Sequence, residues 1–215
     1  GGGHEAWLNT LESDGKIQNN EVSLHDVAKG MITYSSNANT DYLIHLLGME
    51  SINKRIDQLN LQQHEDVYPI VSPLFISEHI QQTGMDEKEL INKLNEMPIA
   101  DYRSIAINLS EQMRTGELNV HDTVFDLSPA LQRVWSDRLI GASANDYGKL
   151  LAIISNDQLP TVAAKTLRDL MEWPMQLNED NHKHFTHLGS KGGSTLFVLN
   201  NAVYAENLNG DQYEL

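Results

Sequence analysis

Residues 31–48 read MITYSSNANTDYLIHLLG, two apolar stretches separated by three small polar residues. The apolar side chains on either side recur every three or four residues, as on one face of a helix, and Gly48 stands where helices commonly end. Serine and asparagine compete for backbone hydrogen bonds, so they favour caps and turns over helix interiors. The stretch therefore predicts two helices joined by a turn of Ser35, Ser36 and Asn37.

Most of the remaining chain has helical patterns up to about residue 175. Ser23 and Ser143 are predicted N-caps, and Pro129 stands at a first helical position, where proline is tolerated. The other predicted helices cover 4–13, 24–32, 50–59, 89–97, 101–115, 129–139, 147–155 and 161–173.

The character of the sequence changes near its end. STLFVLNNAVYAE, at 194–206, predicts a β-strand, and Asn209-Gly210 is typical of a hairpin turn. DQYEL, at 211–215, is predicted to be the returning strand. Because two strands are not stable alone, we expect the neighbouring strands to lie outside this chain, which is then incomplete.

Composition excludes several classes of function. The chain has 215 residues, 40% of them hydrophobic, and a net charge of −15, which suits a soluble globular protein and argues against a nucleic-acid partner. It has no cysteine, so disulfides and thiolate chemistry are excluded. No apolar run reaches the roughly 18 residues of a membrane span, and we expect no cofactor.

A second polar cluster, Lys191-Gly192-Gly193-Ser194, precedes the predicted strand. Glycines beside a lysine leave the backbone open to a ligand, and a serine hydroxyl near a lysine amine can transfer a proton during acyl transfer. Taken singly, each cluster also fits a structural role, a capped junction between helices or a loop entering a strand.

Together and in this order, the clusters resemble the S-x-N and K-T-G motifs of the penicillin-recognising serine hydrolases, the class A β-lactamases and penicillin-binding proteins. The resemblance includes the flanking segments and covers residues 23–61 and 140–206. It implies an α+β, serine β-lactamase/transpeptidase-like fold, a helical domain with part of an antiparallel sheet. Residues 1–175 would be the mainly helical part, with 62–139 an enlarged insertion, and 176–215 the K-x-G strand and the start of a hairpin.

The resemblance also implies roles for individual residues. Ser35 would pass a proton to the leaving nitrogen, and Lys191 would attract the substrate carboxylate and tune Ser35, which makes both catalytic. Asn37 would bind the substrate amide carbonyl. The other implied substrate-binding residues are Gly192, Gly193 and Ser194, whose backbone N–H would form half of an oxyanion hole.

The sequence departs from the family pattern at three places. Ser36 replaces the aspartate of S-D-N, and Gly192 replaces the threonine whose hydroxyl meets the substrate carboxylate. The glutamate that activates water in class A enzymes has no clear counterpart, with Glu65 the nearest. Its absence favours a slowly deacylating, penicillin-binding-like protein over an efficient β-lactamase.

The family nucleophile, the serine of an S-x-x-K tetrad at a helix start, has two candidates by letters. Ser13 and Lys16 precede a polar loop, and Ser51 and Lys54 follow S-x-N, in the wrong order. We therefore expect the true tetrad to lie before residue 1.

Three histidines, His182, His184 and His187, lie just before Lys191. Histidine is a common transition-metal ligand, yet no carboxylate is fixed beside them in the sequence. We expect no metal site, and expect these side chains to line the approach to Lys191 or to be solvated.

The expected function is that of a β-lactamase-like serine hydrolase, acting through an acyl-enzyme on β-lactam or D-Ala-D-Ala-type peptide substrates. Its expected partners are such a small molecule or peptidoglycan peptide and the remaining part of the same protein, with its N-terminal and C-terminal strands. We expect no catalysis from residues 1–215 alone. The resemblance implies export to the periplasm or cell exterior. The alternative is a non-catalytic homologue that binds peptidoglycan or a protein.

Overall fold

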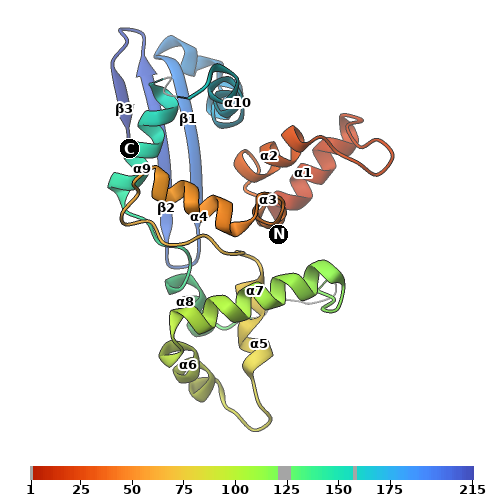
Figure 1. The fold of residues 1–215 in the computed structure, drawn as a ribbon. Helices are drawn as coiled ribbons and strands as arrows, with labels where there is room; N and C mark the ends of the chain where they lie inside the picture. The colour runs from red at the N-terminus through yellow and green to blue at the C-terminus, as the bar shows by residue number, and fades with distance from the viewer. Residues whose placement is uncertain (1, 121–126, 157–158) are drawn as a thin grey trace.

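The computed structural model describes residues 2–120, 127–156 and 159–215, and Figure 1 shows their arrangement. The α-helices are α1 (Gly2–Ser13), α2 (Leu24–Ile32), α3 (Asn37–Leu47), α4 (Met49–Gln58), α5 (Ile76–Ile80), α6 (Glu87–Glu96), α7 (Ile99–Thr115), α8 (Pro129–Asp137), α9 (Ala144–Ser155), α10 (Thr161–Met171) and α11 (Trp173–Leu177). Two 3₁₀ helices are η1 (Ser72–Phe75) and η2 (Glu179–Lys183), and the strands are β1 (Phe185–Ser194), β2 (Leu199–Asn207) and β3 (Gln212–Glu214). The predicted α+β class is confirmed.

Helices α1, α2 and α3 form a separate group beside the sheet (Figure 1). The Ser23 side chain accepts a hydrogen bond from the Asp26 N–H, so the predicted cap of α2 is confirmed. Trp7, Leu11 and Val27 form a small buried core between α1 and α2. This core fixes the direction in which α2 enters the turn before α3.

The largest core lies within the segment predicted to be an insertion, 62–139, at the end of the molecule opposite to α10 (Figure 1). Its buried members are Tyr68, Phe75, Ile76, Leu90, Leu94, Tyr102, Ala106, Leu109 and Val134. The two ends of the segment meet, because Glu65 N–H donates to Gly141 O at 2.9 Å and Gln63 N–H to the Asp146 carboxylate at 2.8 Å. These contacts close the segment into a compact body, although its boundaries as a domain stay a prediction.

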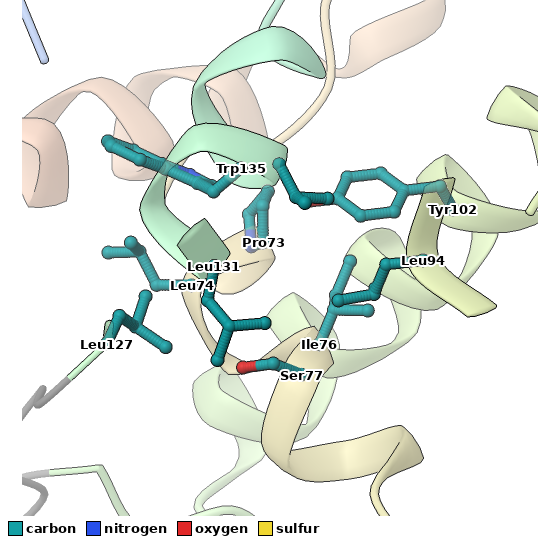
Figure 2. A pocket seen from close by; sticks show the side chains of 10 residues that line it. Pro73, Leu74, Ile76, Ser77, Leu94, Tyr102, Leu127, Leu131 and Trp135 are labelled. Atoms are coloured by element: carbon teal, nitrogen blue, oxygen red, sulfur yellow. The ribbon is translucent and has the colours of Figure 1, made fainter. Parts of the chain in front are cut away.

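Figure 2 shows a small apolar cavity in this body, between η1, α5, α6, α7 and α8. Its volume is about 10 Å³ and its lining includes Leu74, Leu94, Tyr102 and Trp135. A space of that size holds at most one water molecule, so this cavity is a packing defect and not a ligand site.

The sheet has the order β1-β2-β3, and both pairs are antiparallel. The prediction of one strand over 194–206 is wrong, because the chain turns after Ser194. Thr195 causes the turn: its N–H donates to Val198 O at 2.8 Å, and its hydroxyl accepts from Phe197 N–H and Val198 N–H. As a result, Lys191 lies inside β1, opposite Ala202, and not ahead of the strand.

Tyr204 anchors the sheet to the helices. Its side chain is fully buried with Leu151 of α9 and Met171 of α10, and Ile32 of α2 packs on the same cluster. The ring also lies directly beneath Gly189 in β1, since a Cβ added there would lie 2.2 Å from a ring carbon.

None of the helices in the described ranges is both long and apolar enough to cross a bilayer.

We expect Gly189→Ala to lower the free energy of unfolding by about 1–3 kcal/mol, because overpacking a buried ring forces strain into the core. Gly193→Ala is the matched control in the same strand, because a Cβ there meets nothing within 4 Å. Urea unfolding of both variants measures the difference. Equal midpoints for the two would contradict this account of β1 packing.

Candidate active site

The turn between α2 and α3 holds Ser35 in an unusual backbone conformation. Its φ of 55° lies in the left-handed region, which is uncommon for a residue with a side chain. The next residue, Ser36, is buried, caps α3 through its hydroxyl, and donates its N–H to Gly30 O at 3.0 Å. These bonds fix the backbone so that the Ser35 side chain stays exposed, and such over-determined outliers are frequent at functional sites.

Lys191 reaches this turn from the sheet. Its Nζ donates a hydrogen bond to Ser35 Oγ at 2.7 Å, although the two residues are 156 positions apart. Nζ also donates to the carbonyl oxygen of Gly192, its neighbour in β1. The structure thus brings together the two side chains that the sequence predicts to be catalytic, and their chemical roles stay predictions.

Burial lowers the pKa of Lys191 below its ordinary value of 10.5, because partial removal from water disfavours the charged ammonium. A lysine with a lowered pKa exchanges protons more readily near neutral pH. Bonded to a serine hydroxyl, it can return a proton to Ser35 Oγ after that oxygen has given one away. The pair therefore has the chemistry of a proton relay.

The predicted substrate-binding residues flank this pair. Asn37 is the first residue of α3 and is exposed. The last three residues of β1 are also exposed, namely Gly192, Gly193 and Ser194. A ligand beside the Ser35–Lys191 pair would meet open backbone on the sheet side and an amide on the helix side.

A partly buried polar network supports β1. His187 Nδ1 lies 2.9 Å from a Glu172 carboxylate oxygen, to which the Tyr204 hydroxyl also donates at 3.1 Å. Desolvation by burial raises the pKa of Tyr204, so this hydroxyl keeps its proton. Trp173 Nε1 donates to Ser190 O at 2.8 Å, which fixes the backbone next to Lys191.

His187 is therefore part of the network that supports β1, whereas His182 and His184 are exposed. Over 2–120, 127–156 and 159–215, no three histidine or acidic side chains gather in a geometry that could hold a metal ion.

The serines of the two candidate S-x-x-K tetrads lie in α1 and α4. The Ser13 hydroxyl donates to Thr10 O within α1, and Lys16 forms an ion pair with Asp26 at 2.9 Å. Ser51 lies in the first turn of α4.

Glu65 is the nearest match to the class A glutamate. It lies where the two ends of the 62–139 segment meet. Its carboxylate pairs with Arg103 at 3.0 Å and accepts from Gly141 N–H at 3.0 Å. Those contacts give Glu65 a structural role in closing the segment.

The sequence analysis does not identify two residues that contact Ser36, His4 and Asn39. His4 Nδ1 lies 2.9 Å from Ser36 Oγ and 3.2 Å from Asn39 Oδ1, and both Ser36 and Asn39 are buried. The position of Asn39, three residues after the cap, is a local signal that could have indicated its role. For His4, 32 residues before Ser36, no pattern of spacing predicts the contact.

In a comparison with protein-family models, residues 9–176 match the model of the β-lactamase enzyme family. Because the match covers well over half of the chain, this chain belongs to the β-lactamase enzyme family and is of the β-lactamase-like hydrolase type. The match includes Ser35 and Asn37, and it runs through 62–139. The match ends before β1, so the interpretation of Lys191 as the lysine of the K-x-G motif rests on its sequence context and on its contact with Ser35. No curated protein matches the chain significantly.

We expect Lys191 to titrate below its ordinary pKa of 10.5 when ¹³Cε-lysine-labelled protein is followed by NMR as pH rises. Because the folded state binds this proton more weakly than the unfolded state, charged Lys191 destabilises the fold at neutral pH. That penalty disappears as pH rises from the lowered pKa towards 10.5. Lys191→Arg identifies the resonance by removing it. A Lys191 resonance that titrates at or above 10.5 would contradict its partial burial.

Proposed function

We propose that this chain carries the proton-relay and substrate-binding part of a serine acyl-transfer site, acting on β-lactam or D-Ala-D-Ala-type amides. The observation that carries the proposal is the 2.7 Å hydrogen bond from Lys191 Nζ to Ser35 Oγ. It joins the S-x-N turn to the K-x-G strand, and both motifs stand in the order expected for such an enzyme.

In the proposed reaction, a nucleophilic serine gives its proton to the lysine of its S-x-x-K tetrad and adds to the substrate carbonyl carbon, and the C–N bond breaks. The leaving nitrogen takes the proton of the Ser35 hydroxyl, and Lys191 returns a proton to Ser35 Oγ. The negative charge that develops on the carbonyl oxygen is stabilised in part by the Ser194 N–H, at the end of β1. Asn37 binds the substrate amide, and a water molecule later hydrolyses the acyl-enzyme.

We propose that the nucleophile comes from a part of the same protein outside residues 1–215. Support comes from the first tetrad within the chain, because Ser13 is bonded to Thr10 O within α1 and Lys16 is paired with Asp26. A site that acts on peptidoglycan peptides also implies export, so we place the protein in the periplasm or outside the cell.

A second function, as a non-catalytic binding module, is favoured by one residue. Gly192 carries no hydroxyl where the family has threonine, so the K-x-G strand lacks one donor for a substrate carboxylate. A homologue that retains the Ser35–Lys191 pair and binds peptidoglycan peptide without acylation would tolerate that loss.

Intact-protein mass spectrometry of the full-length gene product with a reactive penicillin tests the proposal. We expect one covalent acyl adduct, formed at least about a hundredfold more slowly in Ser35→Ala and in Lys191→Met, in line with typical acid–base contributions. Ser13→Ala and Ser51→Ala are the controls and should acylate at the wild-type rate.

The location of the adduct separates the alternatives. Attachment at Ser13 or Ser51 would refute a nucleophile outside residues 1–215. Absence of any adduct, together with saturable binding of a D-Ala-D-Ala peptide, would favour the binding module.

A further inference from the structure

We propose that His4 is a positioning residue for the Ser35–Ser36–Asn37 turn, which it holds through a single hydrogen bond from Nδ1–H to the buried Ser36 hydroxyl. The importance of this bond for acyl transfer rests on the proposed function, whereas its effect on the turn does not.

The hydrogen-bond chain begins at Asn39. Its side-chain Nδ2 donates to Val27 O at 3.0 Å, so the amide oxygen faces the turn. The Ser36 hydroxyl donates to that oxygen at 2.9 Å, which uses its only proton. Ser36 Oγ can then only accept, and it accepts from the Asn39 N–H at 3.2 Å.

His4 supplies the remaining donor. Its Nδ1 lies 2.9 Å from Ser36 Oγ and 3.2 Å from Asn39 Oδ1, two oxygens that have no further proton to give it. An unprotonated Nδ1 would set its lone pair against the amide oxygen, so the proton of His4 is on Nδ1. Ser36 and Asn39 are almost completely buried, so loss of this donor would leave each of the two oxygens with one donor, Asn39 N–H for Ser36 Oγ and Ser36 Oγ–H for Asn39 Oδ1.

Close packing holds the imidazole in place. The His4 ring lies against Trp7 with centroids 5.3 Å apart, and Trp7 Nε1 donates to Asp26 O at 3.0 Å. Gly3 lies directly on the turn, since a Cβ there would lie 2.1 Å from Tyr34 O. The start of α1 therefore rests against the turn, as its position beside α3 in Figure 1 shows.

This arrangement bears on Ser35 because the two serines are adjacent. Ser36 is fixed by its side chain and by its N–H bond to Gly30 O, so Ser35 has little freedom and keeps its left-handed backbone. Ser36 stands where the family motif has an aspartate, whose longer side chain offers two acceptor oxygens. Here the shorter serine is contacted by His4, whose Nδ1 lies 2.9 Å from Ser36 Oγ.

Two substitutions of His4, to asparagine and to glutamine, distinguish the effect of the hydrogen bond to Ser36 from the effect of ring packing on Trp7. In asparagine the amide nitrogen is two bonds from Cβ, as Nδ1 is in histidine, whereas in glutamine it is three bonds away. His4→Asn therefore keeps a donor near Ser36 Oγ and His4→Gln does not, while both remove the ring from Trp7. A thermal unfolding midpoint and a circular dichroism spectrum for each variant establish that both fold.

Two quantities are measured by NMR in the protein that carries residues 1–215. They are the hydrogen exchange of the Asn39 backbone N–H and the ¹³Cε resonance of Lys191. We expect His4→Gln to accelerate exchange at Asn39 about tenfold, the loss that one net hydrogen bond represents, and to shift the Lys191 resonance. His4→Asn should stay within about twofold of wild type and leave that resonance in place.

Equal effects of the two variants would overturn the proposal, because ring packing would then explain them. Faster exchange in His4→Gln with an unshifted Lys191 resonance would also overturn it, since Ser36 would be loosened without moving Ser35. If both readouts change as expected and no penicillin adduct forms even in wild type, the positioning role stands and the acyl-transfer proposal fails.

Discussion

The contact on which the site depends is the hydrogen bond from Lys191 to Ser35, because it joins two parts of the chain that share no local structure. It exists only if α2 delivers the turn and β1 delivers the lysine to the same place. A shared core secures this, since Ile32 at the end of α2 packs against Leu151, Met171 and Tyr204. Apolar packing thus sets the distance, and the polar pair occupies the resulting junction.

Hydrogen-bonded polar networks support the Ser35–Lys191 pair on two sides. Behind the turn, Ser36 and Asn39 are buried and fully engaged with each other and with His4. Behind the strand, Tyr204 and His187 share the Glu172 carboxylate. Buried polar groups are costly unless they are bonded, so such networks have few alternative arrangements. Rigid support of this kind allows the exposed Ser35 to keep a backbone conformation that serine rarely adopts.

The 62–139 segment has its own core and meets the site strand at its tip, where the Ser136 and Thr195 hydroxyls lie 2.7 Å apart. Arg133 also lies over the Phe197 ring, with its guanidinium carbon 5.2 Å from the centroid. The segment thus holds the turn between β1 and β2, and through that turn it affects the end of the strand that carries Gly192 and Gly193. Its link to the site is through the sheet and not through Glu65.

Most of the helices, the cap at Ser23, the break at Ser35–Asn37 and the two motifs are predictable from the sequence, because helix periodicity, capping and turn chemistry are local. The short helices α5 and α11 are not predicted, and the strand is predicted wrongly, since the turn at Thr195 lies inside a run of β-forming residues and is set by hydrogen bonds that composition does not reveal. That Lys191 meets Ser35 and that His4 contacts Ser36 is visible only in the folded chain. Those contacts span 156 and 32 residues and depend on how separate cores pack, which no spacing along the chain encodes.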